Sequence, residues 1–246
     1  MPSASACASF DPVEHFERHF EVQPVRDDAA RREVFGLRYA VYCEELGYED
    51  PDTFPDGLEH DDFDDDSEFA LLRHRDSGRA AGCVRLILAE RRPGLHFPFE
   101  QVCAGHLDPR LIDLQTLDRV HAGEISRLAV HRDFRRRPGE LVTPEGVVAE
   151  GGDTAFGTRR HPLLAMGLFL AASALGLNRG LDQVLVMMEP RLARLLGSCG
   201  IRFTRVGDVI DYHGKRGPYR IRREELLGAL DPSSRALLDH MVEQLR

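Results

Sequence analysis

Gly123-Glu124-Ile125-Ser126-Arg127-Leu128-Ala129-Val130 is the stretch that decides the fold, because it has the pattern of a buried strand with two charges inside it. Side chains alternate along a strand, which predicts two faces. One face carries Ile125, Arg127 and Ala129, and the other carries Glu124, Ser126, Leu128 and Val130. Because buried charges cost free energy unless they are paired or functional, this strand is the candidate centre of chemistry. A structural salt bridge is the alternative.

The segments around this strand alternate between helical and extended patterns. The predicted helices are 11–20, 26–47, 161–176, 190–197 and 223–245, and the predicted strands are 20–25, 68–73, 80–88, 183–188, 201–206 and 219–221. This order predicts an α/β fold with one mixed central sheet flanked by helices. We expect a single domain over 1–246, with an N-terminal extension at 1–20 and an irregular insertion at 137–160.

Composition narrows the class of protein. The 246 residues suffice for one large domain, and 42% hydrophobic with 30% charged residues is ordinary for a globular protein. The longest apolar run, Leu163 to Leu177, is too short to span a bilayer, and the N-terminus lacks a signal-peptide pattern. The five cysteines include no CxxC pair, so we expect a cytoplasmic protein with neither disulfides nor a zinc site.

Charge is unevenly distributed along the chain. The net charge of −9 argues against nucleic-acid binding. Eight acidic residues and no basic one lie between Asp56 and Glu68, whereas five arginines and one acid lie between Arg127 and Arg137. The basic segment is either a solvated face or a site for an anionic partner.

Candidate partners for the acidic loop lie on other elements. Arg38 precedes Tyr42 by four residues on the predicted helix, and Arg85 lies inside the strand Cys83 to Ile87. Asp61 and Asp64 in the loop would stay ionised if arginines faced them across a cleft. The loop lacks the glycine and terminal glutamate of a calcium site, so we predict no metal.

Four motifs in order resemble the acyl-homoserine-lactone synthases and the long-chain N-acyl amino acid synthases, a branch of the GNAT acetyltransferase fold. The motifs are Leu37 to Tyr48, Asp61-Asp62-Phe63-Asp64, Gly82 to Leu86 and Glu124-Ile125-Ser126-Arg127. From Leu37 to Glu45 the chain more closely resembles the acyltransferases of exosortase/PEP-CTERM systems. Cys43 is the residue that favours this closer resemblance.

The resemblance implies an N-acyltransferase that moves a fatty acyl group from a thioester to the amine of a small amino-acid-like acceptor, with no bound cofactor. Glu124, Ser126 and Arg127 would be catalytic, with Glu124 as the base. The substrate-binding residues would be Arg38, Tyr42, Asp61, Asp64, Arg85, Leu128 and Val130.

The donor is either acyl carrier protein or acyl-CoA. The glycine loop that holds CoA pyrophosphate in GNAT enzymes is matched only in part at Arg136 to Leu141. Arginines stand there instead, namely Arg132, Arg135, Arg136, Arg137, Arg159 and Arg160. Because carrier proteins are acidic, this patch favours an acyl carrier protein as partner and donor.

Three alternatives stay open at this point. The chain could be an acyl-homoserine-lactone synthase that uses S-adenosylmethionine, although Tyr48 and the insertion weaken that interpretation. It could instead be an inactive GNAT-like module that binds acylated ligands, or a regulatory protein that binds metal through its acidic loop.

Overall fold

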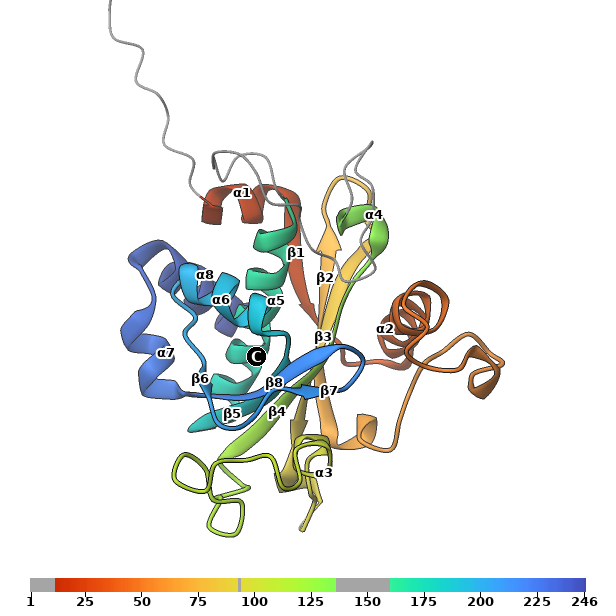
Figure 1. Cartoon of the computed structure of the whole chain (residues 1–246). Helices are drawn as coiled ribbons and strands as arrows, with labels where there is room; N and C mark the ends of the chain where they lie inside the picture. Colours follow the sequence, from red (N-terminus) through yellow and green to blue (C-terminus); the bar gives the residue numbers. More distant parts are fainter. Residues whose placement is uncertain (1–11, 93, 136–159) are drawn as a thin grey trace, which may run out of the picture.

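The computed structural model describes residues 12–92, 94–135 and 160–246, and its centre is one eight-stranded sheet (Figure 1). The predicted insertion at 137–160 lies outside these residues except for Arg160. In chain order the strands are β1 (Phe20–Pro24), β2 (Ser67–His74), β3 (Ala80–Leu88), β4 (Ala122–Val130), β5 (Gln183–Met188), β6 (Thr204–Arg205), β7 (Ile210–Asp211) and β8 (Lys215–Arg222).

The sheet is antiparallel except at one pair. The strand order is β1-β2-β3-β4-β5-β8-β6, with β7 paired to β8. Strands β4 and β5 run parallel, and their pairing ends at Ile125 opposite Val186. Beyond that row β4 continues to Val130 without pairing to β5, so the two strands separate in the middle of the sheet.

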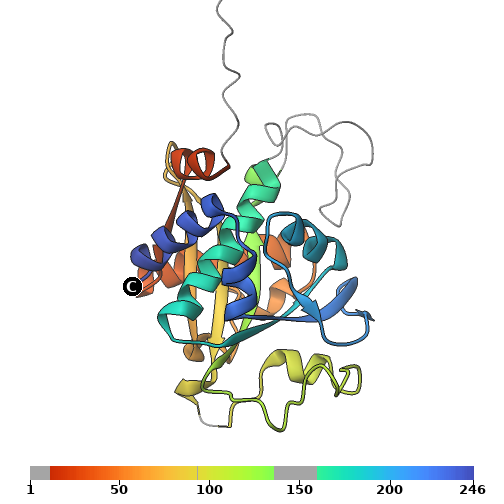
Figure 2. The same ribbon diagram turned by 90° about the vertical axis from the view of Figure 1, so that its left-hand side faces the viewer.

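Helices cover both faces of the sheet. On one side, α5 packs on β2, β3 and β4 beneath α8, and Figures 1 and 2 show these two helices together with α1 and α6. On the other side lie α2 and α3. The described helices are α1 (Pro12–His19), α2 (Asp28–Tyr39), α3 (Pro98–Val102), α4 (Arg132–Arg135), α5 (Arg160–Asn178), α6 (Pro190–Ser198), α7 (Arg223–Ala229) and α8 (Pro232–Gln244).

The sequence explains how α2 begins and why it changes pitch. Asp27 caps it by accepting the Ala30 N–H at 2.8 Å, and Val34 and Leu37 bury its apolar face. The helix continues as a π-helix over Ala40–Glu45. Such wide turns are rare and concentrate at functional sites. Short 3₁₀ turns follow at Pro51–Thr53, Asp64–Asp66 and Ala89–Arg91.

A bulge in β4 overturns the predicted alternation of its faces. Cys83 pairs with Ala129 but Arg85 pairs with Ser126, so Val84 opposes two residues, Arg127 and Leu128. Arg127 has a φ of 48°, in the left-handed region, as the extra residue of a bulge can have. Beyond the bulge Leu128 and Val130 face the α5 side, while Ala129 joins the cluster under α2.

Most predicted elements are confirmed with small shifts. The short helices α3 and α4 were not predicted, and the other differences lie towards the C-terminus. The predicted final helix is two helices, because Asp231 caps α8 at Ser233 and Ser234 with Pro232 in its first turn. Strand β6 is limited to Thr204–Arg205, and β8 begins at Lys215, before the predicted strand 219–221. Within the described residues, no helix is both long enough and apolar enough to cross a bilayer.

We expect Gly82→Ala to destabilise the protein by roughly 1–3 kcal/mol, because a Cβ would lie 2.9 Å from the Ala129 carbonyl oxygen and 3.0 Å from Leu168. Gly197→Ala in α6 is the matched control. No atom lies within 4 Å of its Cβ position, and alanine favours helix. Urea unfolding midpoints measure both effects, and equal midpoints would contradict the packing of β3 against α5.

Candidate functional site: a buried arginine–carboxylate cluster on β4

Arg38 is the most deeply buried member of the cluster. It projects from α2 and is 0% exposed. Its Nε donates to Glu59, and its Nη1 donates to Asp64 Oδ1 at 2.7 Å. Burial alone lowers the pKa of Arg38, but the hydrogen bond and charge of Glu59 outweigh burial and raise it, so the guanidinium stays charged.

Arg85 joins the acidic loop to the central strands. From β3 its Nη1 donates to Asp61 and, at 2.7 Å, to Asp64 Oδ1, while its Nε donates to Ser126 Oγ at 3.0 Å. Burial opposes the charge on Asp61, but Arg85 outweighs it and holds the pKa of this carboxyl below its usual range. Asp61 is therefore ionised at neutral pH.

Arg127 completes the cluster because of the bulge. Its Nε donates to Glu59 Oε1 at 3.1 Å, and its Nη2 lies 3.1 Å from Glu49 Oε1 and 3.4 Å from Asp61 Oδ2. A regular strand would direct this side chain to the α5 face. In the bulged strand it lies with Arg85 and Ser126 on the same side of the sheet.

Sequence patterns missed two members of the cluster. Glu59 is 0% exposed and binds both Arg38 and Arg127, and Glu49 binds Arg127 from the loop that follows the π-helix. Both residues were visible as acids of a polar loop. Only their position beside two arginines from distant segments distinguishes them from solvated charges.

Glu124 lies apart from the cluster, beneath α3. It is 4% exposed, and its Oε2 accepts the Phe99 N–H at 2.8 Å. The nearby core is apolar and includes Ile87, Phe97 and Leu185. Burial raises the pKa of Glu124 to about 8, despite the opposing Phe99 hydrogen bond and the charges of Arg85 and Arg127. A carboxyl with that pKa can take up and release a proton near neutral pH.

The remaining predicted substrate residues flank the bulge. Tyr42, on the π-helix, donates its hydroxyl to the Leu128 carbonyl at 2.8 Å, and its ring lies 5.6 Å from the Arg127 guanidinium carbon. Tyr48 stacks on Tyr42 with ring centroids 6.5 Å apart. Val130, by contrast, packs in the core against α5.

The arginines predicted to bind the donor are only partly described. Arg132 is exposed, and Arg135 pairs with Glu45. Arg136, Arg137 and Arg159 lie outside the described residues. Arg160 begins α5, and its side chain is also outside the described part.

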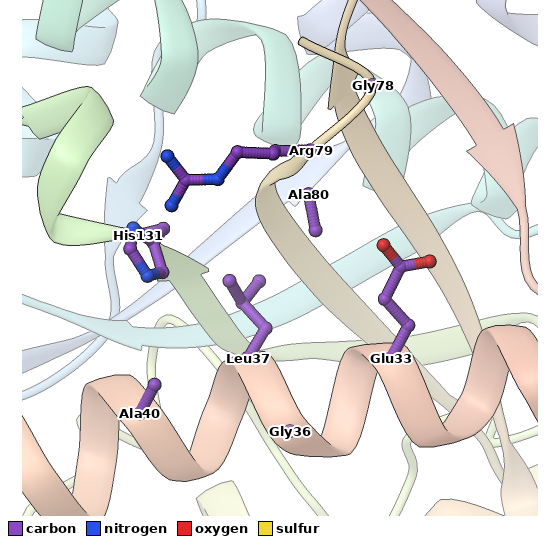
Figure 3. Close-up of a pocket in the computed structure, with 8 residues that line it drawn as sticks. All are labelled: Glu33, Gly36, Leu37, Ala40, Gly78, Arg79, Ala80 and His131. Carbon is purple, nitrogen blue, oxygen red and sulfur yellow. The ribbon is translucent and has the colours of Figure 1, made fainter.

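A groove of about 420 Å³ opens between α2, the β2–β3 turn and the end of β4 (Figure 3). Arg79 extends from the β2–β3 turn towards His131 at the end of β4, and Glu33 stands on α2. Its lining residues are Glu33, Gly36, Leu37, Ala40, Gly78, Arg79, Ala80 and His131, none of which was predicted to bind substrate. The groove is thus distinct from the buried cluster.

Possible metal ligands gather away from the cluster. Atoms of His19, His74 and Asp76 lie within 4.8 Å of one another near the β2–β3 turn. In the acidic loop, Glu59, Asp61 and Asp64 are already paired with arginines. The arginines therefore compensate the negative charge of these carboxylates, and no metal ion is needed to do so.

Glu124→Gln should change how stability depends on pH. The carboxyl has a pKa of about 8 when folded and an ordinary value of 4.5, so folding takes up a proton between these values and wild-type stability falls as pH rises. Relative to wild type, the variant should gain roughly 2–4 kcal/mol between about pH 5 and about pH 8 in urea unfolding.

Glu100→Gln is the control for this experiment. Burial opposes the charge on Glu100, but Arg119 and His96 outweigh it and hold the pKa of Glu100 below its usual value. Loss of that carboxylate should cost a nearly constant free energy across the same pH range. If the difference in free energy of unfolding between Glu124→Gln and wild type were also independent of pH, the raised pKa of Glu124 would be contradicted.

Comparison with known proteins agrees with the resemblance in the motifs. Residues 37–144 match the sequence profile of the family described as "Acetyltransferase (GNAT) domain". This segment contains Arg38, the acidic loop, β3 and β4. The match supports the prediction of an N-acyltransferase. Among curated proteins, no significant match was found.

Three solved structures with similar folds illustrate the likeness. TofI, in a ternary complex with an inhibitor and MTA, has a TM-score of 0.56 at 23% identity, over 88% of this chain and 99% of its own. FeeM, an N-acyl amino acid synthase from uncultured soil microbes, has a TM-score of 0.56 at 14% identity, over 86% of this chain and 94% of its own. BjaI, a CoA-dependent acyl-homoserine lactone synthase bound to MTA, has a TM-score of 0.53 at 20% identity, over 91% of this chain and 89% of its own.

At these identities the structures show a shared fold. The protein therefore has the GNAT acyltransferase fold, and its residues 37–144 match the acetyltransferase domain family of that fold.

Proposed function

We propose that the protein transfers a fatty acyl group from a thioester to the amine of a small amino-acid-like acceptor. The observation that carries the proposal is Glu124, a carboxyl with a pKa of about 8 on the same side of β4 as the arginine–carboxylate cluster. A base with this pKa suits removal of a proton from an amine near neutral pH.

The proposed reaction is direct transfer. The amine nitrogen attacks the thioester carbonyl carbon, the C–N bond forms, and the C–S bond breaks. Glu124 accepts the amine proton, directly or through water, and the departing thiolate takes up a proton. Backbone N–H groups of β4 beyond Ile125, where pairing with β5 ends, would polarise the carbonyl oxygen. Positioning of the two reactants supplies much of the rate.

The cluster shapes the acceptor side in this proposal. Arg38 and Arg85 hold Asp61 and Asp64 in place, and Ser126 is held by Arg85. Because these groups are buried and mutually paired, they need little reorganisation when an acceptor binds. Arg127, at 24% side-chain exposure, is the member best placed to contact an acceptor carboxylate.

We further propose acyl carrier protein as the preferred donor, used in the cytosol. The arginines at Arg132 to Arg137 support an acidic partner, although BjaI is described as CoA-dependent. The link to exosortase/PEP-CTERM systems, based on Leu37 to Glu45 with buried Cys43, is part of the same proposal. A homoserine-lactone synthase, as BjaI is described, is the second candidate because its fold is shared.

Purified protein, incubated with hexadecanoyl thioesters of acyl carrier protein or CoA and a mixture of amino acids, should form an N-acyl amino acid detectable by mass spectrometry. Turnover should be faster with the carrier protein. Glu124→Gln should lower kcat by about 10²–10⁴-fold, because the base is lost while its shape is kept.

Glu100→Gln serves as the matched control, because Glu100 lies within α3 and its carboxylate is hydrogen-bonded to Arg119. It should retain activity. Full activity of Glu124→Gln at all pH values would overturn the base assignment. A lactone formed only when S-adenosylmethionine is added would identify the second candidate instead.

A further inference from the structure

Two histidines and an aspartate converge where the end of α1 meets the turn between β2 and β3. One ligand atom from each of His19, His74 and Asp76 lies within 4.8 Å of the other two. His19 is the last residue of α1, His74 ends β2, and Asp76 lies in the turn that follows. We call these three residues the histidine–aspartate cluster. It shares no residue with the arginine–carboxylate cluster on β4.

Backbone contacts fix the positions of the three residues relative to one another. Phe20, which follows His19, pairs with His74 where β1 begins. The Arg75 N–H donates to the His19 carbonyl at 2.8 Å. The Gly78 N–H donates to the His74 carbonyl, also at 2.8 Å, and closes the turn around the aspartate. Because strand pairing and the turn already bring the ligands together, little ordering is needed when an ion binds.

Neighbouring side chains orient the His74 ring. Its Nδ1 lies 2.9 Å from Ser77 Oγ, and this hydrogen bond leaves Nε2 for an ion. The ring also packs against Phe20 and Phe134, with ring centroids 5.4 Å and 5.3 Å away. In metal sites, a hydrogen bond at the second nitrogen of a histidine fixes the orientation and the tautomer of the ring. Ser77 is placed to make that bond here.

The charge around the cluster favours a cation. The side chain of Asp76 is exposed and makes no hydrogen bond or ion pair with another described residue. The two arginines of the turn have other partners. Arg75 lies 3.3 Å from Glu21, and Arg79 lies 2.7 Å from Asp133. The carbonyl end of α1 adds partial negative charge at the same place.

The spacing and the chemistry of the three ligand atoms suit a zinc ion. Because no two of the atoms are more than 4.8 Å apart, one point lies within about 2.8 Å of all three. Zinc binds histidine nitrogen and carboxylate oxygen at about 2.0–2.2 Å, so each side chain needs to move by less than about 1 Å. The exposed turn that carries Asp76 can make this adjustment. Calcium and magnesium fit less well, because they prefer oxygen ligands.

We propose that the histidine–aspartate cluster binds one Zn²⁺ ion, which joins α1 to the β2–β3 turn. Water completes the coordination of the ion. Through the packing of Phe134 on His74, the site also adjoins α4. Figure 1 shows α1, α4 and this turn at the same end of the sheet. No local motif marks the site in the sequence, because pairing of β1 with β2 brings His19 to His74.

The test is calorimetric titration of the metal-free full chain with ZnCl₂. Wild type should bind Zn²⁺ at this site with a micromolar or tighter Kd. Asp76→Asn and His19→Asn should each weaken Kd by about tenfold or more, because each removes one of three ligands. Zinc should raise the thermal unfolding midpoint of wild type more than that of either variant, because the ion binds the folded chain.

Asp118→Asn is the matched control. Asp118 is also an exposed aspartate beside a histidine, with Oδ2 2.8 Å from His121 Nδ1, but no second imidazole of the described residues joins this pair. The Kd of this variant should stay within about twofold of wild type, as for other surface substitutions.

Three outcomes would overturn the site. They are a wild type that binds no Zn²⁺ at micromolar concentration, equal Kd values for Asp76→Asn and Asp118→Asn, and an equal rise of the unfolding midpoint with CaCl₂. The measurements use the metal alone, so they do not depend on acyl transfer. A chain that binds zinc here and transfers no acyl group would retain this site and lose only the proposed function.

Discussion

One extra residue in β4 determines how the charges of the site are arranged. The bulge at Arg127 reverses the alternation of faces, so Glu124, Ser126 and Arg127 all act on the side of the sheet that faces α2 and α3. A left-handed φ at a residue other than glycine is strained, and the surrounding contacts must stabilise it. Arg127 has such contacts with Glu49, Glu59 and Asp61.

The ion pairs and the bulge depend on each other. Arg38 and Arg85 are almost inaccessible to water, and each is compensated by carboxylates from the acidic loop. A buried pair of this kind contributes little net stability, but loss of one partner is costly, which makes the arrangement specific. The π-helix adds Tyr42, whose hydrogen bond to Leu128 holds the residue that follows Arg127. Glu124 remains outside these pairs, and burial alone dominates its pKa.

The order of strands and helices was predictable, because apolar periodicity in 68–73, 80–88 and 161–176 reflects burial directly. The break before α8 was missed, although Asp231-Pro232 is an ordinary helix start. The bulge was not predictable, because no glycine marks it and its register depends on β3. Likewise, Glu59 looks like any acid of a polar loop until Arg38 and Arg127 are placed beside it. Contacts between distant segments carry no local periodic signal.

A double-mutant cycle between Arg127 and Glu59 tests the bulge most directly. Free energies of unfolding would be measured for wild type, Arg127→Met, Glu59→Gln and the double variant. With Arg127 Nε 3.1 Å from Glu59 Oε1, the account predicts a coupling of about 1 kcal/mol or more. In a regular strand Arg127 would point to the opposite face. A coupling within about 0.3 kcal/mol of zero would therefore contradict the account.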